Sequence, residues 1–187
     1  ANPEFNGKNI AEVTQIARKS KKVDDQIEQM FEMYEQGGAQ MVYQVMSEDD
    51  VKAIMSEPFT MIASDSGVRE FGSGVPHPRG YGNNARVLGK YVREMKLITL
   101  EDAVRKMTSL PANMFGMRDR GQIREGFVAD IVIFDEKTIS DKATFDQPHQ
   151  YATGFSKVMV NGEIVFNGEK MTHVMSGQAI RGNGYSK

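Results

Sequence analysis

Two short apolar runs, each preceded by a helical pattern, most constrain what this chain can fold into. Residues 39–46 (AQMVYQVM) and 59–63 (FTMIA) are a few residues long and apolar on both faces. Strands of this kind belong to parallel sheets that helices cover on both sides. Helical spacing over residues 23–36, and the capping-box pattern of residues 47–50, predict a helix before each run. Two strands cannot form such a sheet alone, so this α/β part is predicted to be incomplete.

The later segments predict more helices and then a change to β structure. Apolar spacing indicates a helix over residues 85–95, and a second capping-box pattern at residues 99–102 predicts a helix that continues to residue 107. Pro111 favours the first turn of another short helix. Residues 131–134 (IVIF) predict a strand. Alternating apolar residues on both sides of Asn161-Gly162 predict a β-hairpin, for which Asn-Gly is the strongest short signal.

Composition excludes several classes of protein. The net charge of −2 gives no reason to expect a nucleic acid or an anionic membrane as partner. The apolar runs are far shorter than the roughly 20 residues of a transmembrane helix. The chain has no cysteine, which excludes disulfides and thiolate zinc sites. It opens on Ala1 without a signal-like apolar region, as an excised segment of a longer protein would.

A carboxylate and a glycine-rich, cationic loop follow the second apolar run. Asp65 lies just after that run, and active sites of parallel α/β folds lie at the carboxyl ends of strands. In the loop, Arg79 has a planar fork suited to a carboxylate, and His77 could orient substrate, donate a proton or bind metal. The alternatives are that Asp65 caps a turn, that Arg79 is solvated and that His77 bonds to backbone.

The histidines do not form a metal site by spacing. His77, His149 and His173 are the three histidines, and none belongs to a His-x-His or His-x-x-x-His pair. A hydrolytic metal site needs about three protein ligands and an open position. If Asp65 acts on a metal, most of the ligands of that metal lie outside this chain.

Ordered motifs along the chain resemble those of a known family. The segments GQIREGFVADIVIFD (121–135) and VMVNGEIVFNG (158–168) resemble the C-terminal signature of the amidohydrolase superfamily. The ordered set NPEFNGKNIAEV, MSEDDVKAIMSEP, IASDSG, HPRGYG, RVLGKYVRE, KMTSLPANMFGMRDRG and ATFDQPHQY is similar to the D-aminoacylases, the N-acyl-D-amino-acid deacylases. The resemblance covers essentially the whole chain.

This resemblance implies a fold, which is the C-terminal part of a metal-dependent (β/α)8 TIM barrel followed by strands of a small β-sandwich. Residues 1–118 would be the barrel segment, with residues 39–46 and 59–63 as its last two strands. Residues 119–187 would be part of the sandwich. The remaining N-terminal barrel portion would be the partner of this chain, and we expect a cytoplasmic location.

The resemblance also implies a reaction, the zinc-assisted hydrolysis of the amide bond of N-acyl-D-amino acids. One or two zinc ions would be bound mainly by residues outside this chain, and Asp65 would be the catalytic residue that takes a proton from the metal-activated water and passes it to the leaving amine. Asp65 could also contact the metal. Arg79 would bind the carboxylate of the N-acyl amino acid substrate, beside His77.

The chain departs from the family pattern in two loops, and it lacks the metal ligands of the family. It has Ser-Asp-Ser-Gly where the family usually has Ser-Asp-Gly, and GNNARVLG where threonine, phenylalanine and proline are more usual. The family's His-x-His strand and further metal ligands are not in this sequence, so we expect the chain alone to be inactive. Two alternatives stay open: another amidohydrolase, such as a dihydropyrimidinase-like enzyme or another amidase, and a non-catalytic truncated domain with a binding or assembly role.

Overall fold

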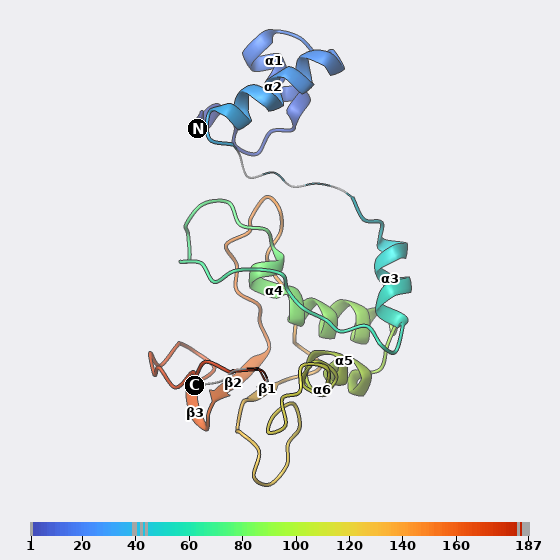
Figure 1. The fold of residues 1–187 in the computed structure, drawn as a ribbon, viewed down its shortest axis with the longest axis vertical. Helices are drawn as coiled ribbons and strands as arrows, with labels where there is room; N and C mark the ends of the chain where they lie inside the picture. Colours follow the sequence, from blue (N-terminus) through green and yellow to red (C-terminus); the bar gives the residue numbers. More distant parts are fainter. Residues whose placement is uncertain (1, 39–40, 42, 44, 183, 185–187) are drawn as a thin grey trace. The chain divides into compact units, whose positions relative to one another are not determined.

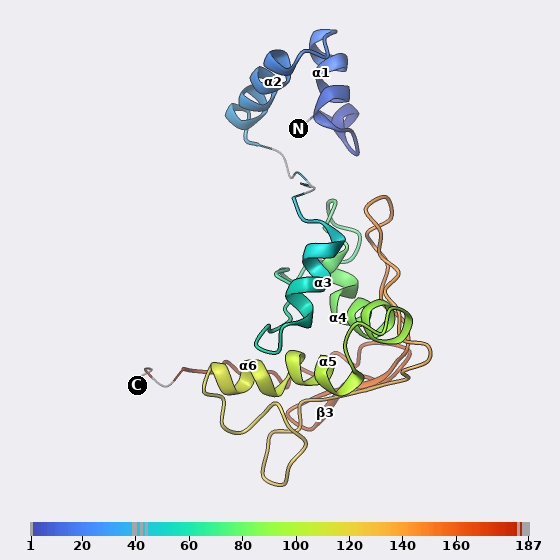
Figure 2. The same ribbon diagram turned by 90° about the vertical axis from the view of Figure 1, so that its right-hand side faces the viewer.

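The computed structural model describes residues 2–38, 41, 43, 45–182 and 184. The chain divides into two compact units, Ala1–Gln44 and Val45–Lys187 (Figures 1 and 2). Within the described ranges, no helix has the length and apolarity needed to cross a membrane. The boundary expected near residue 118 stays a prediction.

The first unit is a pair of helices with a short 3-10 turn. The turn η1 spans Pro3–Phe5, and the helices α1 and α2 span Ile10–Arg18 and Val23–Glu35. Asn9 and Glu12 cap each other's backbone N–H groups at the start of α1, as in a capping box. The helix expected over residues 23–36 from its apolar spacing is confirmed as α2.

The second unit begins with helix α3, which spans Glu48–Ser56. The hydroxyl of Ser47 accepts a hydrogen bond from the Asp50 N–H, so the predicted cap is confirmed. Lys90 forms an ion pair of 2.7 Å with Glu48 and so ties α3 to the helix that carries Lys90.

The parallel strands expected in the first half are not found among the described residues. The strand expected over residues 39–46 lies partly outside them, and residues 41, 43, 45 and 46 have no regular structure. Residues 59–63 are not a strand, which corrects that prediction. A strand needs a neighbouring strand for its backbone groups, and here the Ile62 N–H instead donates to the Lys106 carbonyl at 3.1 Å.

The next helix begins six residues earlier than the sequence pattern predicts. Helix α4 spans Arg79–Arg86 and continues as the π-helix η2 over Val87–Glu94. Its start at Arg79 corrects the expected start at residue 85. Glycines obscured this start because they are poor helix formers, yet Gly82 and Gly89 let the helix lie directly against the segment around Asp141.

Two short helices follow, as predicted. Helix α5 spans Leu100–Met107 and is capped by the Thr99 hydroxyl, which accepts from the Asp102 N–H. Helix α6 spans Ser109–Met114 and includes Pro111 in its first turn. The Lys106 side chain on α5 is fully buried.

The described strands form one antiparallel sheet in the order β1-β2-β3. These strands span Ile131–Phe134, Phe155–Val160 and Glu163–Phe166. Asn161 and Gly162 have φ angles of +50° and +83°, the conformation that a two-residue hairpin turn requires. The strand and the hairpin predicted from the sequence are both confirmed.

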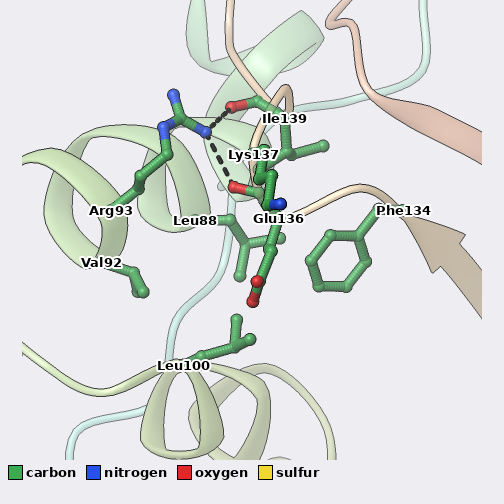
Figure 3. A pocket seen from close by; sticks show the side chains of 8 residues that line it. All are labelled: Leu88, Val92, Arg93, Leu100, Phe134, Glu136, Lys137 and Ile139. Atoms are coloured by element: carbon green, nitrogen blue, oxygen red, sulfur yellow. Dashed lines mark hydrogen bonds between the residues drawn. The ribbon is translucent and has the colours of Figure 1, made fainter.

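The core of the second unit lies between α4–η2, α5 and the segment after β1. Its buried members are Ala85, Val87, Leu88, Tyr91, Ala103 and Ile139. A small, mostly apolar cavity of about 160 Å³ lies beside this core, and Figure 3 shows the side chains that line it. At its edge the Arg93 guanidinium donates to the carbonyls of Glu136 and Ile139, at 3.2 and 2.6 Å, which fixes the chain after β1 against η2.

Candidate active site

Asp65 follows an irregular segment whose backbone is hydrogen-bonded to Lys106 of helix α5. The buried Lys106 ammonium donates to the carbonyls of Glu57 and Thr60, and the Lys106 carbonyl accepts from Ile62. Asp65 then adopts the left-handed conformation with φ of +48°, which aspartate tolerates better than most residues. Its side chain is 90% exposed. These hydrogen bonds therefore hold a solvent-facing carboxylate at the end of the segment.

The structure brings Asp65 and Arg79 together. The Arg79 Nη2 atom lies 3.1 Å from Oδ2 of Asp65, and Arg79 is the first residue of α4. Gly80 makes this approach close, because a Cβ atom at that position would lie 2.7 Å from the Ser66 hydroxyl. Asp65 and Arg79, which separate motifs predict as site residues, thus form an ion pair.

His77 has a local structural contact in addition to its place beside Arg79. Its Nδ1 atom accepts from the Arg79 backbone N–H at 3.0 Å, and its ring meets Phe145 edge to face with centroids 4.9 Å apart. Burial, and then the positive charge of Arg79, lower the pKa of His77 below its ordinary value of 6.5. The neutral ring carries its proton on Nε2, where it can donate to an oxygen of a ligand.

His149, for which the sequence patterns predict no role, contacts the loop between Asp65 and Arg79. The ring of His149 contacts Gly72, Gly74 and the hydroxyl of Tyr81 through hydrogen bonds. The available signal was the motif ATFDQPHQY, which ends in a histidine followed closely by a tyrosine. That signal identified the family but could not show which loop the histidine contacts.

The described residues do not complete a metal site. No group of three or more His, Asp or Glu side chains in the described ranges could hold a metal ion. Two of the histidines make local contacts, His77 with Arg79 and His149 with the loop, whereas His173 is exposed after β3. Asp65 offers a single carboxylate, fewer donors than a zinc site needs. A zinc ion here would need ligands from elsewhere.

The arrangement of charges allows simple acid–base and anion-binding chemistry. The exposed Asp65 carboxylate can accept and release a proton. The Arg79 guanidinium has further N–H donors for the two oxygens of a second carboxylate. Because both groups face solvent at one place, a small molecule with an anionic end could contact both.

The curated relatives of the chain include two enzymes that are named for amide deacylation. It is 38% identical over 178 residues to the D-aminoacylase of Alcaligenes xylosoxydans xylosoxydans, covering 95% of this chain and 34% of that protein. It is 46% identical over 125 residues to the N-acyl-D-glutamate deacylase of the same organism, covering 67% of this chain and 25% of the relative. The chain thus spans about a third or less of the length of these relatives.

Solved structures give the same correspondence in three dimensions. A D-aminoacylase structure that concerns a binuclear metal centre superposes with a TM-score of 0.79 at 38% identity, covering 94% of this chain and 35% of the other. A second structure is that of the N-acyl-D-glutamate deacylase of Bordetella bronchiseptica, complexed with zinc and a phosphonate inhibitor. It superposes with a TM-score of 0.59 at 46% identity, and the superposition covers 65% of this chain and 25% of the deacylase chain.

The sequence model of the Amidohydrolase family matches residues 8–166, most of the chain. The match includes Asp65, Arg79 and the sheet strands β1 to β3. The motifs, the fold and the relatives therefore agree, and this chain belongs to the amidohydrolase family.

Proposed function

We propose that this chain is the C-terminal part of an N-acyl-D-amino-acid deacylase, a hydrolase that cleaves the amide bond to release a carboxylate and a D-amino acid. The observation that carries the proposal is the pairing of Asp65 with Arg79 at 3.1 Å, because this reaction needs a proton carrier and an anion binder side by side. The similarity to deacylases at 38–46% identity supports the choice of substrate class.

Asp65 is the proposed catalytic residue. It accepts a proton from the water that attacks the acyl carbon, so that the new C–O bond forms without a free hydronium ion. It then gives that proton to the nitrogen as the C–N bond breaks, which releases a neutral amine. Its exposed side chain at the end of a tethered segment suits both transfers.

Arg79 is the proposed binding residue for the substrate carboxylate, and His77 assists it. The resting ion pair between Arg79 and Asp65 is exposed, and pairs of this kind contribute about 1 kcal/mol or less. A substrate carboxylate that makes two hydrogen bonds with the guanidinium can therefore replace Asp65. The exchange would release Asp65 for proton transfer as the substrate binds.

The remaining parts of the proposal concern the portions that this chain does not supply. Residues 1–118 would complete a TIM barrel with an N-terminal portion, and residues 119–187 would belong to a small β-sandwich. Zinc, bound mainly by residues of the N-terminal portion, would polarise the acyl carbonyl and lower the pKa of a water molecule. We expect the isolated chain to be inactive, and a cytoplasmic location also stays a prediction.

The test is an assay of the complete protein, loaded with zinc, on N-acetyl-D- and N-acetyl-L-amino acids and on cyclic dihydropyrimidines. Hydrolysis of the D-compounds alone is the expected result, and ring opening of the cyclic compounds would instead favour another amidohydrolase. Asp65→Asn should lower kcat by several orders of magnitude, because it removes both proton transfers. Retained turnover in that variant would exclude Asp65 from the mechanism, and a complete protein inactive on every amide would favour a binding role.

A further inference from the structure

His149 holds the glycine-rich loop through both of its ring nitrogens. The Gly72 N–H donates to Nδ1 at 3.2 Å, and Nε2 lies 2.9 Å from the Gly74 carbonyl oxygen. A backbone N–H can only donate and a carbonyl can only accept. The two contacts together therefore require a neutral imidazole with its proton on Nε2. The ring bridges two points of a loop that lies some 75 residues earlier in the sequence.

The same histidine also ties down the beginning of helix α4. The Tyr81 hydroxyl lies 3.0 Å from Nδ1 and donates to it, sharing the single lone pair of that nitrogen with the Gly72 N–H. Tyr81 is in the first turn of α4, two residues after Arg79. One imidazole thus connects the middle of the loop to the turn that carries the proposed carboxylate-binding residue.

Aromatic rings support these hydrogen bonds. Phe71 stacks on Tyr151 with centroids 4.9 Å apart, and it meets His149 and Tyr81 edge to face at 5.7 and 5.9 Å. Rings packed at such distances attract one another, so Phe71 adds ring contacts to the hydrogen bonds between His149 and Tyr81. We call Phe71, Tyr81, His149 and Tyr151 the loop clasp.

We propose that His149 is a positioning residue for the candidate site: by holding Gly72, Gly74 and Tyr81 together, it fixes the loop whose two ends carry Asp65 and Arg79. Without the clasp, the glycines of this loop would leave it many conformations, and substrate binding would have to select one of them. This inference rests on the proposed function, since only a substrate held by Arg79 makes the position of the loop matter for activity.

The test uses the complete, zinc-loaded protein and two variants. His149→Phe keeps a ring for the clasp but removes both nitrogens, whereas Tyr81→Phe removes a single hydroxyl. In His149→Phe we expect hydrogen–deuterium exchange of residues 68–76 to become about tenfold faster, and KM for an N-acetyl-D-amino acid to rise about tenfold with a smaller change in kcat. In Tyr81→Phe we expect about threefold changes in both. The control is His173→Asn, which removes an exposed histidine where the φ of +63° suits asparagine.

Hydrogen–deuterium exchange tests whether the clasp holds the loop, and KM tests whether the loop positions the substrate. Unchanged exchange of residues 68–76 in both variants would overturn the clasp, and faster exchange with unchanged KM would overturn its role in positioning. If His149→Phe does not fold, Tyr81→Phe still gives either result. A wild-type protein without deacylase activity would refute the proposed function, yet its exchange rates would still show whether His149 holds the loop.

Discussion

Replacing Gly82 by alanine tests how closely helix α4 must approach the segment that follows β1. A Cβ atom at Gly82 would lie 2.6 Å from Cβ and 3.3 Å from Cα of Asp141, whereas ordinary contact begins at 3.4 Å. The helix and the segment would have to separate by about 0.8 Å, because neither atom of Asp141 can rotate away. Alanine is favoured over glycine in a helix by about 1 kcal/mol, and overpacking costs about 1–3 kcal/mol. The expected net loss of stability is therefore about 1 kcal/mol.

The same shift should reach the site, because Arg79 lies one turn before Gly82. A displacement near 1 Å can lower the rate about a hundredfold, so we expect kcat/KM to fall at least tenfold. Urea unfolding followed by circular dichroism measures the stability, and steady-state kinetics measure the activity. The control is Asn84→Ala on the exposed side of α4, which should change stability by less than about 0.5 kcal/mol. A Gly82→Ala protein more stable than wild type and equally active would refute the reasoning.

Three further predictions concern single side chains. Arg79→Lys keeps the charge but loses the two-pronged geometry, so KM should rise with a smaller effect on kcat; an unchanged KM would contradict carboxylate binding. Because the folded protein holds the pKa of His77 below 6.5, the unfolded chain takes up the proton first. Stability should therefore be complete above pH 6.5 and decrease as the pH falls below it, and His77→Gln should flatten this part of a curve of unfolding free energy against pH. Lys106→Met should lower the free energy of unfolding by about 2 kcal/mol, because it removes charged hydrogen bonds to the carbonyls of Glu57 and Thr60. Denaturant unfolding measures this change. An unchanged free energy of unfolding would show that water satisfies these carbonyls as well as the ammonium does.

Local signals were sufficient for most of the helices and for the hairpin. Ser47 and Thr99 cap helices where their spacing from an acid predicted it, and Asn161-Gly162 forms the expected turn. These elements depend on contacts within a few residues, which a sequence contains in full. A pattern of neighbouring residues cannot show which segment, far away in the sequence, a helix or strand will pack against.

The predictions that failed depended on distant neighbours. Residues 59–63 have the composition of a strand, but a strand also needs an adjacent strand, and the Lys106 side chain and carbonyl bind this segment instead. Helix α4 begins at Arg79 despite its glycines because the helix packs against Asp141, which is 59 positions after Gly82. Tertiary packing outweighed local propensity in both places.

For the candidate site, the sequence predicted the residue types but not how they meet. Asp65 and Arg79 were named from separate motifs, and their ion pair is visible only in three dimensions. His149 was counted among the scattered histidines, because its contacts with Gly72 and Gly74 bridge a separation that no local pattern encodes.

The left-handed backbone at Asp65 restricts what can occupy that position apart from any chemistry. At a φ of +48°, residues with bulky or β-branched side chains are strained, whereas glycine, asparagine and aspartate are accommodated. Glutamate would supply the same charge on a longer stem and would add backbone strain. Of the two acidic amino acids, the backbone geometry therefore favours the shorter one. In a saturation library, the glycine and asparagine variants would fold about as well as the aspartate, so a screen for folding alone would not retain the carboxylate that the proposed function needs.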